Sequence, residues 1–430
     1  MLSTLRARVK LQPYQNVLFL HPPNDHDAEQ QQQDHVLWGT IALALPKSRE
    51  VHSVVVQLVA YYTLAIPGHA AESGILAEYS TELTVSRMLD KGEHTFAWSL
   101  AIPRTAPSQE RCSFGRVYHR LHAIVDCANG ALKDDVPLLL TVNHAPDGET
   151  LSLNEGIAGH HDEVGPYIFT LTAGHLTVGG VVHFTMSFTS VPTDMRIYSV
   201  SAHIVQSYIL ESPTKPGLFA KPAPHRRRFF TLDCHTGSKP DGASIVKSSG
   251  SQEPAPDGLL GFVPAGESLE ISRVARVPND DLVRGSTQPR TRGAPIRLSH
   301  VIEIEVRFSG SHGEEAQRQR ALKVQCPITL SSCCCMLESL LLPSYSDVNP
   351  DEETRNLKAN VLDLETPLRR TVECTCGFTL ERLLLAQTHA PILQAHEDIA
   401  NGFRNSSNTD VFMSSKISPH STPSHVTVLS

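Results

Sequence analysis

The stretch from Val36 to Leu64, VLWGTIALALPKSREVHSVVVQLVAYYTL, decides the fold class. It contains two runs that are rich in β-branched and aromatic residues, Val36 to Leu45 and Val51 to Leu64, and a Pro-Lys-Ser segment separates them. Within the first run, Thr40 to Leu45 alternates small or polar residues with large apolar ones, so every second side chain would face a core. The pattern predicts neighbouring β-strands, each with one buried and one solvated face.

Similar patterns continue along the chain in both directions. His94 to Leu100 alternates in the same way, and the sequence before residue 145 has no amphipathic run of helical length. We therefore expect a fold that is built from antiparallel strands. Further strands are expected at 17–20, 116–125, 136–143, 167–173, 181–190, 196–209, 267–277, 299–308 and 320–329.

Two blocks of strands organise the chain. Its 430 residues are enough for two or three domains, and a turn-rich segment near 150–163 separates the blocks. We expect an all-β protein with two tandem antiparallel, immunoglobulin-like sandwiches at 8–145 and 164–332.

Two other parts of the chain have compositions that predict disorder. Residues 211–258 are broken by seven prolines, and we expect them to form a disordered insertion in the second sandwich. The tail at 333–430 should be mostly disordered, and its Ser-, Thr- and Asn-rich end at 405–430 entirely so. A short helix is a candidate at 380–399, although Pro391 would interrupt it.

The charge balance excludes a nucleic-acid binder that works through bulk charge. The chain has 37 Lys and Arg against 45 Asp and Glu, which gives a formal net charge of −8. No run of about 18 apolar residues exists to cross a bilayer, and no apolar signal-peptide core follows the basic start. We expect a cytoplasmic protein.

The cysteines do not indicate a disulfide framework, because the chain has nine of them, an odd number that is unevenly spread. Five lie late in the chain, at positions 333–335, 374 and 376, and their CCC and CxC spacings differ from the CxxC knuckles of structural zinc sites. We therefore expect reduced thiols, no metal and no cofactor. Palmitoylation of the triplet is an alternative, because several leucines follow it.

The order of motifs in the first block adds a family resemblance. Trp38 to Leu43 and Val51 to Leu58 form a glycine-led strand and its neighbour, and Lys91 to Pro103 carries a Gly, an aromatic pair and an Ile-Pro stop. Gly115 to Ala123 follows in the same order. The series resembles the α-arrestin family, which implies two arrestin-like sandwiches and an adaptor in place of a catalyst.

The second block agrees with this resemblance. Ile197 to Gln206 is similar to a strand in which an inward Gln follows alternating apolar residues, and Ser299 to Val306 with Val324 to Leu330 resemble the last two strands of an arrestin C-terminal domain. The resemblance implies a cargo, which is the cytoplasmic part of a membrane transporter or receptor. It also implies recruitment from the cytoplasm to the plasma membrane or endosomes.

The tetrapeptide Leu342-Pro343-Ser344-Tyr345 stands where α-arrestins carry a PPxY or LPxY motif. The resemblance implies that Leu342, Pro343 and Tyr345 bind a WW domain of a HECT-type E3 ubiquitin ligase, and that the cargo is then ubiquitinated and endocytosed. Proline's fixed φ favours the polyproline conformation that such grooves accept. Leu342 replaces the first proline of PPxY, so we expect modest affinity. The alternative is a loop that folds back onto the sandwich.

Two further groups of residues are candidates under the same interpretation. Lys358 and Lys323 are the lysines near the motif, and they are the expected ubiquitin acceptors, Lys358 before Lys323. Arg226, Arg227 and Arg228 form a basic cluster, which is a candidate contact for anionic lipid or for an acidic face of a cargo protein.

Two rival functions stay open. A scaffold of arrestin or retromer type would link cargo to trafficking or pH-signalling machinery without a ligase. A carbohydrate-active β-sandwich would need carboxylates clustered at loop tips, whereas the acidic residues here are scattered. The serine hydrolase, zincin, dinucleotide and P-loop signatures are missing from the sequence, so we expect no enzyme.

Overall fold

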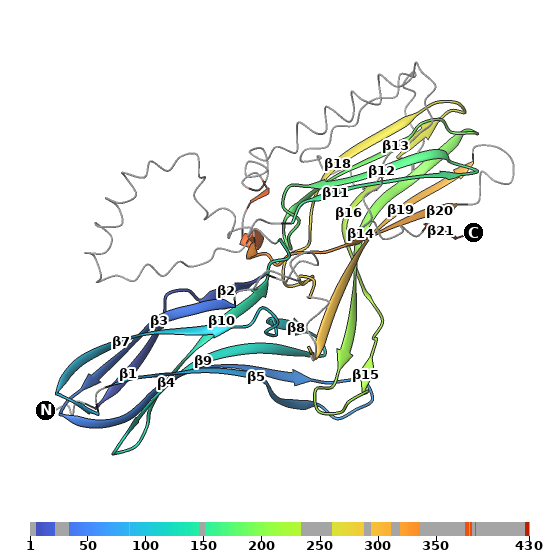
Figure 1. The fold of residues 1–430 in the computed structure, drawn as a ribbon. Helices are drawn as coiled ribbons and strands as arrows, with labels where there is room; N and C mark the ends of the chain where they lie inside the picture. Colours follow the sequence, from blue (N-terminus) through green and yellow to red (C-terminus); the bar gives the residue numbers. More distant parts are fainter. Residues whose placement is uncertain are drawn as a thin grey trace, which may run out of the picture.

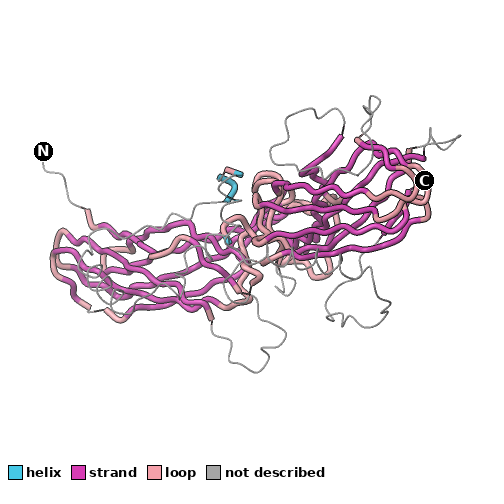
Figure 2. Tube along the Cα trace, turned by 90° about the horizontal axis from the view of Figure 1, so that it is seen from above, coloured by secondary structure: helices cyan, strands magenta, loops and turns pink. Residues whose placement is uncertain are grey.

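The chain forms two β-sandwiches that lie end to end (Figures 1 and 2). This computed structural model describes residues 6–21, 34–85, 87–145, 151–233, 260–287, 294–310, 319–335, 375–377, 379–380, 383 and 426–429. Strands dominate these residues, which confirms the predicted all-β fold class. Within this described part, no helix has the length and apolar character needed to span a bilayer.

The first sandwich pairs a three-stranded sheet with a seven-stranded sheet. The smaller sheet consists of β1 (Arg8–Pro13), β3 (His35–Leu45) and β7 (Gly92–Ile102), with β3 in the middle. The larger sheet has the order β2-β10-β9-β4-β5, and its strands are antiparallel except for β2 beside β10. Its strands are β2 (Val17–Leu20), β10 (Leu132–Val142), β9 (Gly115–Cys127), β4 (Arg49–Leu64) and β5 (Glu72–Leu83), with β6 (Met88–Leu89) on β4 and β8 (Glu110–Cys112) on β9.

Alternation along these strands builds the first core. In β3, Leu37, Ile41 and Leu43 are fully buried, whereas Trp38 on the opposite face is 56% exposed. The buried side chains pack against those of β4, for example Val56, in one apolar cluster. Each such side chain contributes about 1.5–3 kcal/mol when it leaves water, so the period-two pattern of the sequence fixes which face is inside.

The second sandwich pairs a four-stranded sheet with another seven-stranded sheet. The smaller sheet has the order β11 (Leu153–His161), β12 (Gly165–Ala173), β13 (Val181–Phe188) and β18 (Leu269–Arg276). The larger sheet follows the path β15-β14-β19-β20-β21, with β16 and β17 also on β14. Its strands are β14 (Met195–Glu211), β15 (Phe219–Ala220), β16 (His225–Asp233), β17 (Gly261–Val263), β19 (Ile296–Gly310), β20 (Arg320–Ile328) and β21 (Val426–Leu429).

An aromatic group anchors the second core. Phe169 packs against Phe184 and Phe188, with ring centroids 6.2 Å and 6.4 Å apart, and all three side chains are fully buried. Phe184 also lies 5.1 Å from Phe230, which comes from β16. Such aromatic pairs add about 0.5–1.5 kcal/mol beyond the area that they bury, so β16 is part of the core.

The prediction of a disordered insertion at 211–258 is therefore wrong for residues 211–233. β15 pairs with the end of β14, and β16 runs along β14 from Gln206 to Ser199 with one β-bulge. The prolines between β14 and β16 suggested a broken loop, and a run of arginines is unusual in a strand. Burial of the Phe230 side chain stabilises the pairing of β16 with β14, and this stabilisation outweighs the effect of the prolines and the arginines. Residues 234–258 lie outside the described residues.

Three other expectations on organisation differ from the structure or fall outside it. The segment predicted as a linker at 150–163 contains β11, which pairs with β12 over its whole length. The end at 405–430 was expected to lack structure, whereas Val426–Leu429 pairs with β20. Of the candidate helix at 380–399, only residues 380 and 383 are described.

Candidate functional site

A buried apolar cluster joins the two sandwiches, and we call it the seam core. It forms where β14 and β19 extend beyond their own sandwich toward the first one (Figure 1). From the second sandwich it takes Leu210 and Ile296, which are both fully buried. Its buried members are Tyr62, Leu64, Ile66, Val117, Tyr208, Leu210, Ile296 and Leu298. The seam core gives the sandwiches a shared hydrophobic contact.

The segment after β14 adds polar contacts to the seam core. The hydroxyl of Ser212 donates to Oε2 of Glu72 at 2.9 Å, and the hydroxyl of Thr214 donates to the same oxygen at 2.7 Å. Glu72 begins β5 of the first sandwich. Ser212 and Thr214 belong to the stretch that was predicted to be disordered, and their hydrogen bonds to Glu72 link the two sandwiches.

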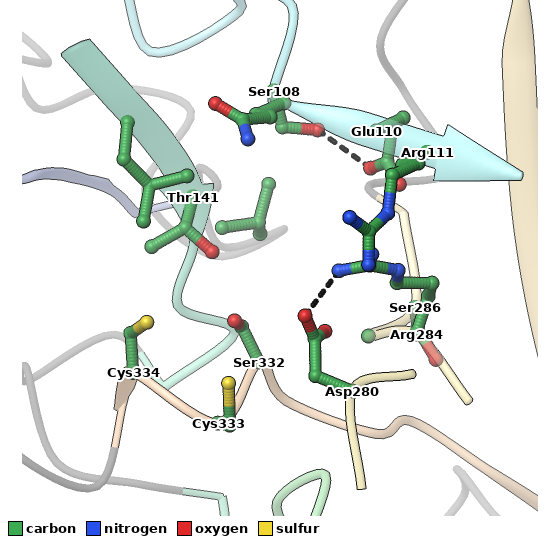
Figure 3. A pocket seen from close by; sticks show the side chains of 14 residues that line it. Ser108, Glu110, Arg111, Thr141, Asp280, Arg284, Ser286, Ser332, Cys333 and Cys334 are labelled. Carbon is green, nitrogen blue, oxygen red and sulfur yellow. Dashed lines mark hydrogen bonds and ion pairs between the residues drawn. The ribbon is translucent and has the colours of Figure 1, made fainter. Parts of the chain in front are cut away.

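A polar cavity of about 220 Å³ lies between the sandwiches. Ser108, Glu110, Arg111, Asp280 and Arg284 all line it (Figure 3). The first three residues come from β8 and the segment before it, and the last two come from the segment after β18. Side chains from both sandwiches therefore build this site.

Glu110 is the titratable centre of the cavity. The hydroxyl of Ser108 donates to Oε1 of Glu110 at 2.9 Å, and Arg284 forms an ion pair with Asp280 in the same cavity. Burial raises the pKa of the Glu110 carboxyl to about 8, and the charge of Asp280 adds to the rise, against the opposing effects of Ser108 and Arg284. Glu110 is therefore protonated at neutral pH.

This protonation predicts a pH dependence of stability. The folded pKa of Glu110 is raised from 4.5 to about 8, so its contribution to stability is complete below about pH 4.5 and is lost as the pH rises toward 8. Glu110→Gln should remove this loss. The free energy of unfolding of the variant relative to the wild type should increase between pH 5 and 8, by up to about 1.4 kcal/mol per pH unit.

Urea titrations at several pH values measure this difference. Glu82→Gln, on the exposed face of β5, is the matched control and should give a difference that does not change with pH. An equally flat difference for Glu110→Gln would contradict a protonated Glu110 in the folded protein.

A buried hydrogen-bond chain leads from the seam into the second sandwich. His144 Nε2 lies 3.0 Å from the carbonyl oxygen of Ser286, whose hydroxyl lies 2.8 Å from His300 Nδ1. His300 Nε2 then lies 3.0 Å from Gln206 Oε1, which also accepts the backbone N–H of Arg284 at 2.9 Å. Burial, together with a smaller effect of the nearby His144, lowers the pKa of His300 to about 4. A neutral His300 therefore connects Ser286 to the inward Gln206.

The arginine cluster lies on a strand, which corrects the prediction that placed it in a disordered loop. Arg226, Arg227 and Arg228 belong to β16 and are exposed. Arg226 Nη2 is 2.7 Å from Oε1 of Glu303 and 2.9 Å from Oε2 of Glu305. Both glutamates lie on strand β19 and are buried. These carboxylates offset the charge of Arg226, so the positive charge available to an anionic surface is smaller than the sequence suggests.

The remaining predicted site residues divide into described and undescribed ones. Lys323 lies in β20, and its Nζ is 3.6 Å from Oε2 of Glu305 with a side chain only 24% exposed. Leu342, Pro343, Tyr345 and Lys358 lie outside the described residues. Their roles stay predictions.

The sequence pointed to Gln206 as an inward residue and to the cysteine triplet, but it did not indicate the charged residues of the cavity. Glu110, Asp280 and Arg284 are far apart along the chain, and nothing in their local sequence indicates that they meet. The one usable signal was polarity at positions flanking strands, and this signal is too common to select them.

Comparison with known proteins adds information on the family. No protein-family model matches the chain. An arrestin-related trafficking adapter of Schizosaccharomyces pombe is 21% identical over 273 residues, which make up 61% of this chain and 50% of that protein. This likeness supports an arrestin-like family. It also supports an adaptor role, and the chain spans about half the length of the curated relative that it matches.

Proposed function

We propose that this protein is an arrestin-type adaptor, which binds the cytoplasmic part of a membrane transporter or receptor and recruits a HECT-type E3 ubiquitin ligase for ubiquitin-dependent endocytosis. The observation that carries the proposal is the pair of β-sandwiches held together by the seam core. The likeness to an arrestin-related trafficking adapter supports the same role.

The architecture suits binding better than catalysis. Two sandwiches fixed at a common seam present long sheet faces and loops to a partner, while the seam cavity has one protonated carboxyl, Glu110, next to an ion pair. The proposed cargo contacts lie on these outer sheet faces and loops.

The ligase contact is assigned to Leu342, Pro343 and Tyr345. Proline's fixed φ favours the polyproline conformation, so little conformational entropy should be lost on docking into a WW groove. The Tyr345 ring should contribute most of the buried area, and its hydroxyl can still find a hydrogen-bond partner. The segment begins seven residues after Cys335, which ends the turn at 332–335, so a bound ligase would be tethered close to the two sandwiches.

Titration of the full chain with isolated WW domains tests this contact. We expect a Kd in the micromolar range or weaker, about −8 kcal/mol or less favourable. Tyr345→Ala should abolish binding, and Leu342→Pro should strengthen it because a second fixed ring lowers the ordering cost. If neither the wild type nor Leu342→Pro binds any WW domain tested, the ligase-recruiting role is wrong.

The second candidate is a scaffold of arrestin or retromer type that links cargo to trafficking or pH-signalling machinery without a ligase. The raised pKa of Glu110 between the sandwiches favours a pH-responsive version of it. The WW titration separates the two, since the scaffold does not need Tyr345.

A further inference from the structure

A tight turn at the seam carries the cysteine triplet. The backbone N–H of Cys335 donates to the carbonyl of Ser332 at 3.0 Å, which makes Cys333 and Cys334 the two central residues of the turn. The turn is held on both sides. Cys333 belongs to the core of the second sandwich, and the thiol of the fully buried Cys335 lies 3.4 Å from the carbonyl of Val142 in the first.

The two central thiols differ in access. Cys333 is buried, whereas Cys334 is half-buried, and both line the cavity between the sandwiches (Figure 3). A molecule that enters the cavity therefore meets the Cys334 sulfur. Burial of Cys333 and Cys335 leaves little room for a lipid chain, so the turn suits a small reagent better than palmitoylation.

The surroundings of Cys334 favour its thiolate. Hydrogen bonds from the side chains of Cys333 and Ser332 lower the pKa of the Cys334 thiol, and they outweigh burial and the negative charge of Asp280. By contrast, burial raises the pKa of the Cys326 thiol to about 12. Since the thiolate is the reactive form, Cys334 should react with oxidants before Cys326 does.

We propose that Cys333 and Cys334 form a redox modification site, a vicinal dithiol that hydrogen peroxide converts into a disulfide between adjacent residues. The neighbouring thiols, the turn that places them together and the cavity that admits the oxidant carry this assignment. It is independent of the proposed adaptor function.

The chemistry balances in two steps. The Cys334 thiolate attacks one peroxide oxygen, the O–O bond breaks, and the departing hydroxide takes a proton to leave as water. The Cys333 sulfur then attacks the resulting sulfenic sulfur, the S–O bond breaks, and a second water leaves with the remaining proton. Two thiols lose two electrons in total, and one peroxide is reduced to two waters.

The product should be easy to reduce. Adjacent Cα atoms are about 3.8 Å apart, which is closer than the roughly 4.4–6.8 Å of ordinary disulfides, and such a bond stores strain. Strained disulfides are the labile and regulatory ones. The turn also connects the two sandwiches through the contact of Cys335 with Val142. Oxidation should therefore change the contact between the sandwiches.

Counting the thiols of the full chain that can be alkylated tests the site. The chain is treated with a small excess of hydrogen peroxide, alkylated, digested and analysed by mass spectrometry. We expect the wild type to lose two alkylatable thiols at positions 333 and 334, and mild dithiol treatment to restore both. The loss should persist in Cys335→Ser and Cys376→Ser but not in Cys333→Ala or Cys334→Ser.

The variants Cys335→Ser and Cys376→Ser show whether either of these cysteines, in place of Cys333 or Cys334, takes part in the disulfide. Cys376 also approaches this region, because its sulfur accepts the backbone N–H of Asp280 at 3.3 Å. Persistence of both thiols in the wild type, or loss of the disulfide in Cys376→Ser or Cys335→Ser, would overturn the assignment. Melting temperatures under reducing conditions show whether each variant is folded, and Cys334→Ser, at a half-buried position, is the variant on which the result rests if Cys333→Ala fails to fold.

Discussion

Replacing Leu210 by alanine should split the thermal unfolding of the protein into two transitions. Leu210 is fully buried, and it lies where β14 has left its own sandwich to enter the seam core. Loss of a buried leucine side chain costs about 2–5 kcal/mol. Because the seam core is small, this loss should uncouple the sandwiches before it unfolds either of them, and differential scanning calorimetry would show the separation.

Ile204→Ala is the matched control for this experiment. Ile204 lies on the same strand and is also fully buried, but it belongs to the core of the second sandwich. Its loss should lower the melting temperature of the second sandwich and leave the coupling between the sandwiches intact. If Leu210→Ala lowers one cooperative transition in the same way as Ile204→Ala, the seam core does not act as a separate coupling element.

Gly39→Ala should destabilise the first sandwich strongly. A Cβ atom at this position would clash with the carbonyl oxygen of Gln12, and it would lie 2.6 Å from Cζ2 of Trp98 and 2.8 Å from the Cα of Pro13. Two of these contacts are with backbone, which cannot move without breaking the pairing of β1 with β3. Overpacking of this kind costs about 1–3 kcal/mol or more, and urea unfolding should show it.

Gly156→Ala provides the comparison for Gly39→Ala. Gly156 lies in β11, and a Cβ atom built there has no heavy atom within 4 Å. This variant should match or slightly exceed the wild-type stability, because alanine reduces the freedom of the unfolded chain. Equal destabilisation at both positions would show that the close approach at Gly39 is not the cause.

The strands that the sequence predicted correctly share a clear period of two. Thr40 to Leu45 alternates strictly, and β3 buries every second residue there. β5 was missed because no residue of this edge strand is fully buried, so its alternation is weak. β16 was missed because its apolar residues Phe229 and Phe230 are adjacent, and a bulge in its pairing with β14 interrupts the period.

The seam was less predictable than the sandwiches. The apolar residues of the seam core lie near the ends of strands, and their sequence pattern is the same as that of residues in the core of a single sandwich. They form one cluster only because the two sandwiches meet there. The cysteine triplet illustrates the same limit. Its spacing argued against zinc, whereas the turn at Ser332 and the contact of Cys335 with Val142 depend on tertiary structure.

Proximity labelling in cells tests the adaptor proposal most directly, since it reports cargo and ligase in one experiment. A promiscuous labelling enzyme is fused to the wild type and to Tyr345→Ala, and the biotinylated proteins are compared. We predict that the wild type labels a membrane transporter or receptor together with a HECT-type ligase, and that Tyr345→Ala keeps the membrane protein and loses the ligase. Equal labelling of the ligase by both proteins, or labelling of no membrane protein by the wild type, would contradict the account.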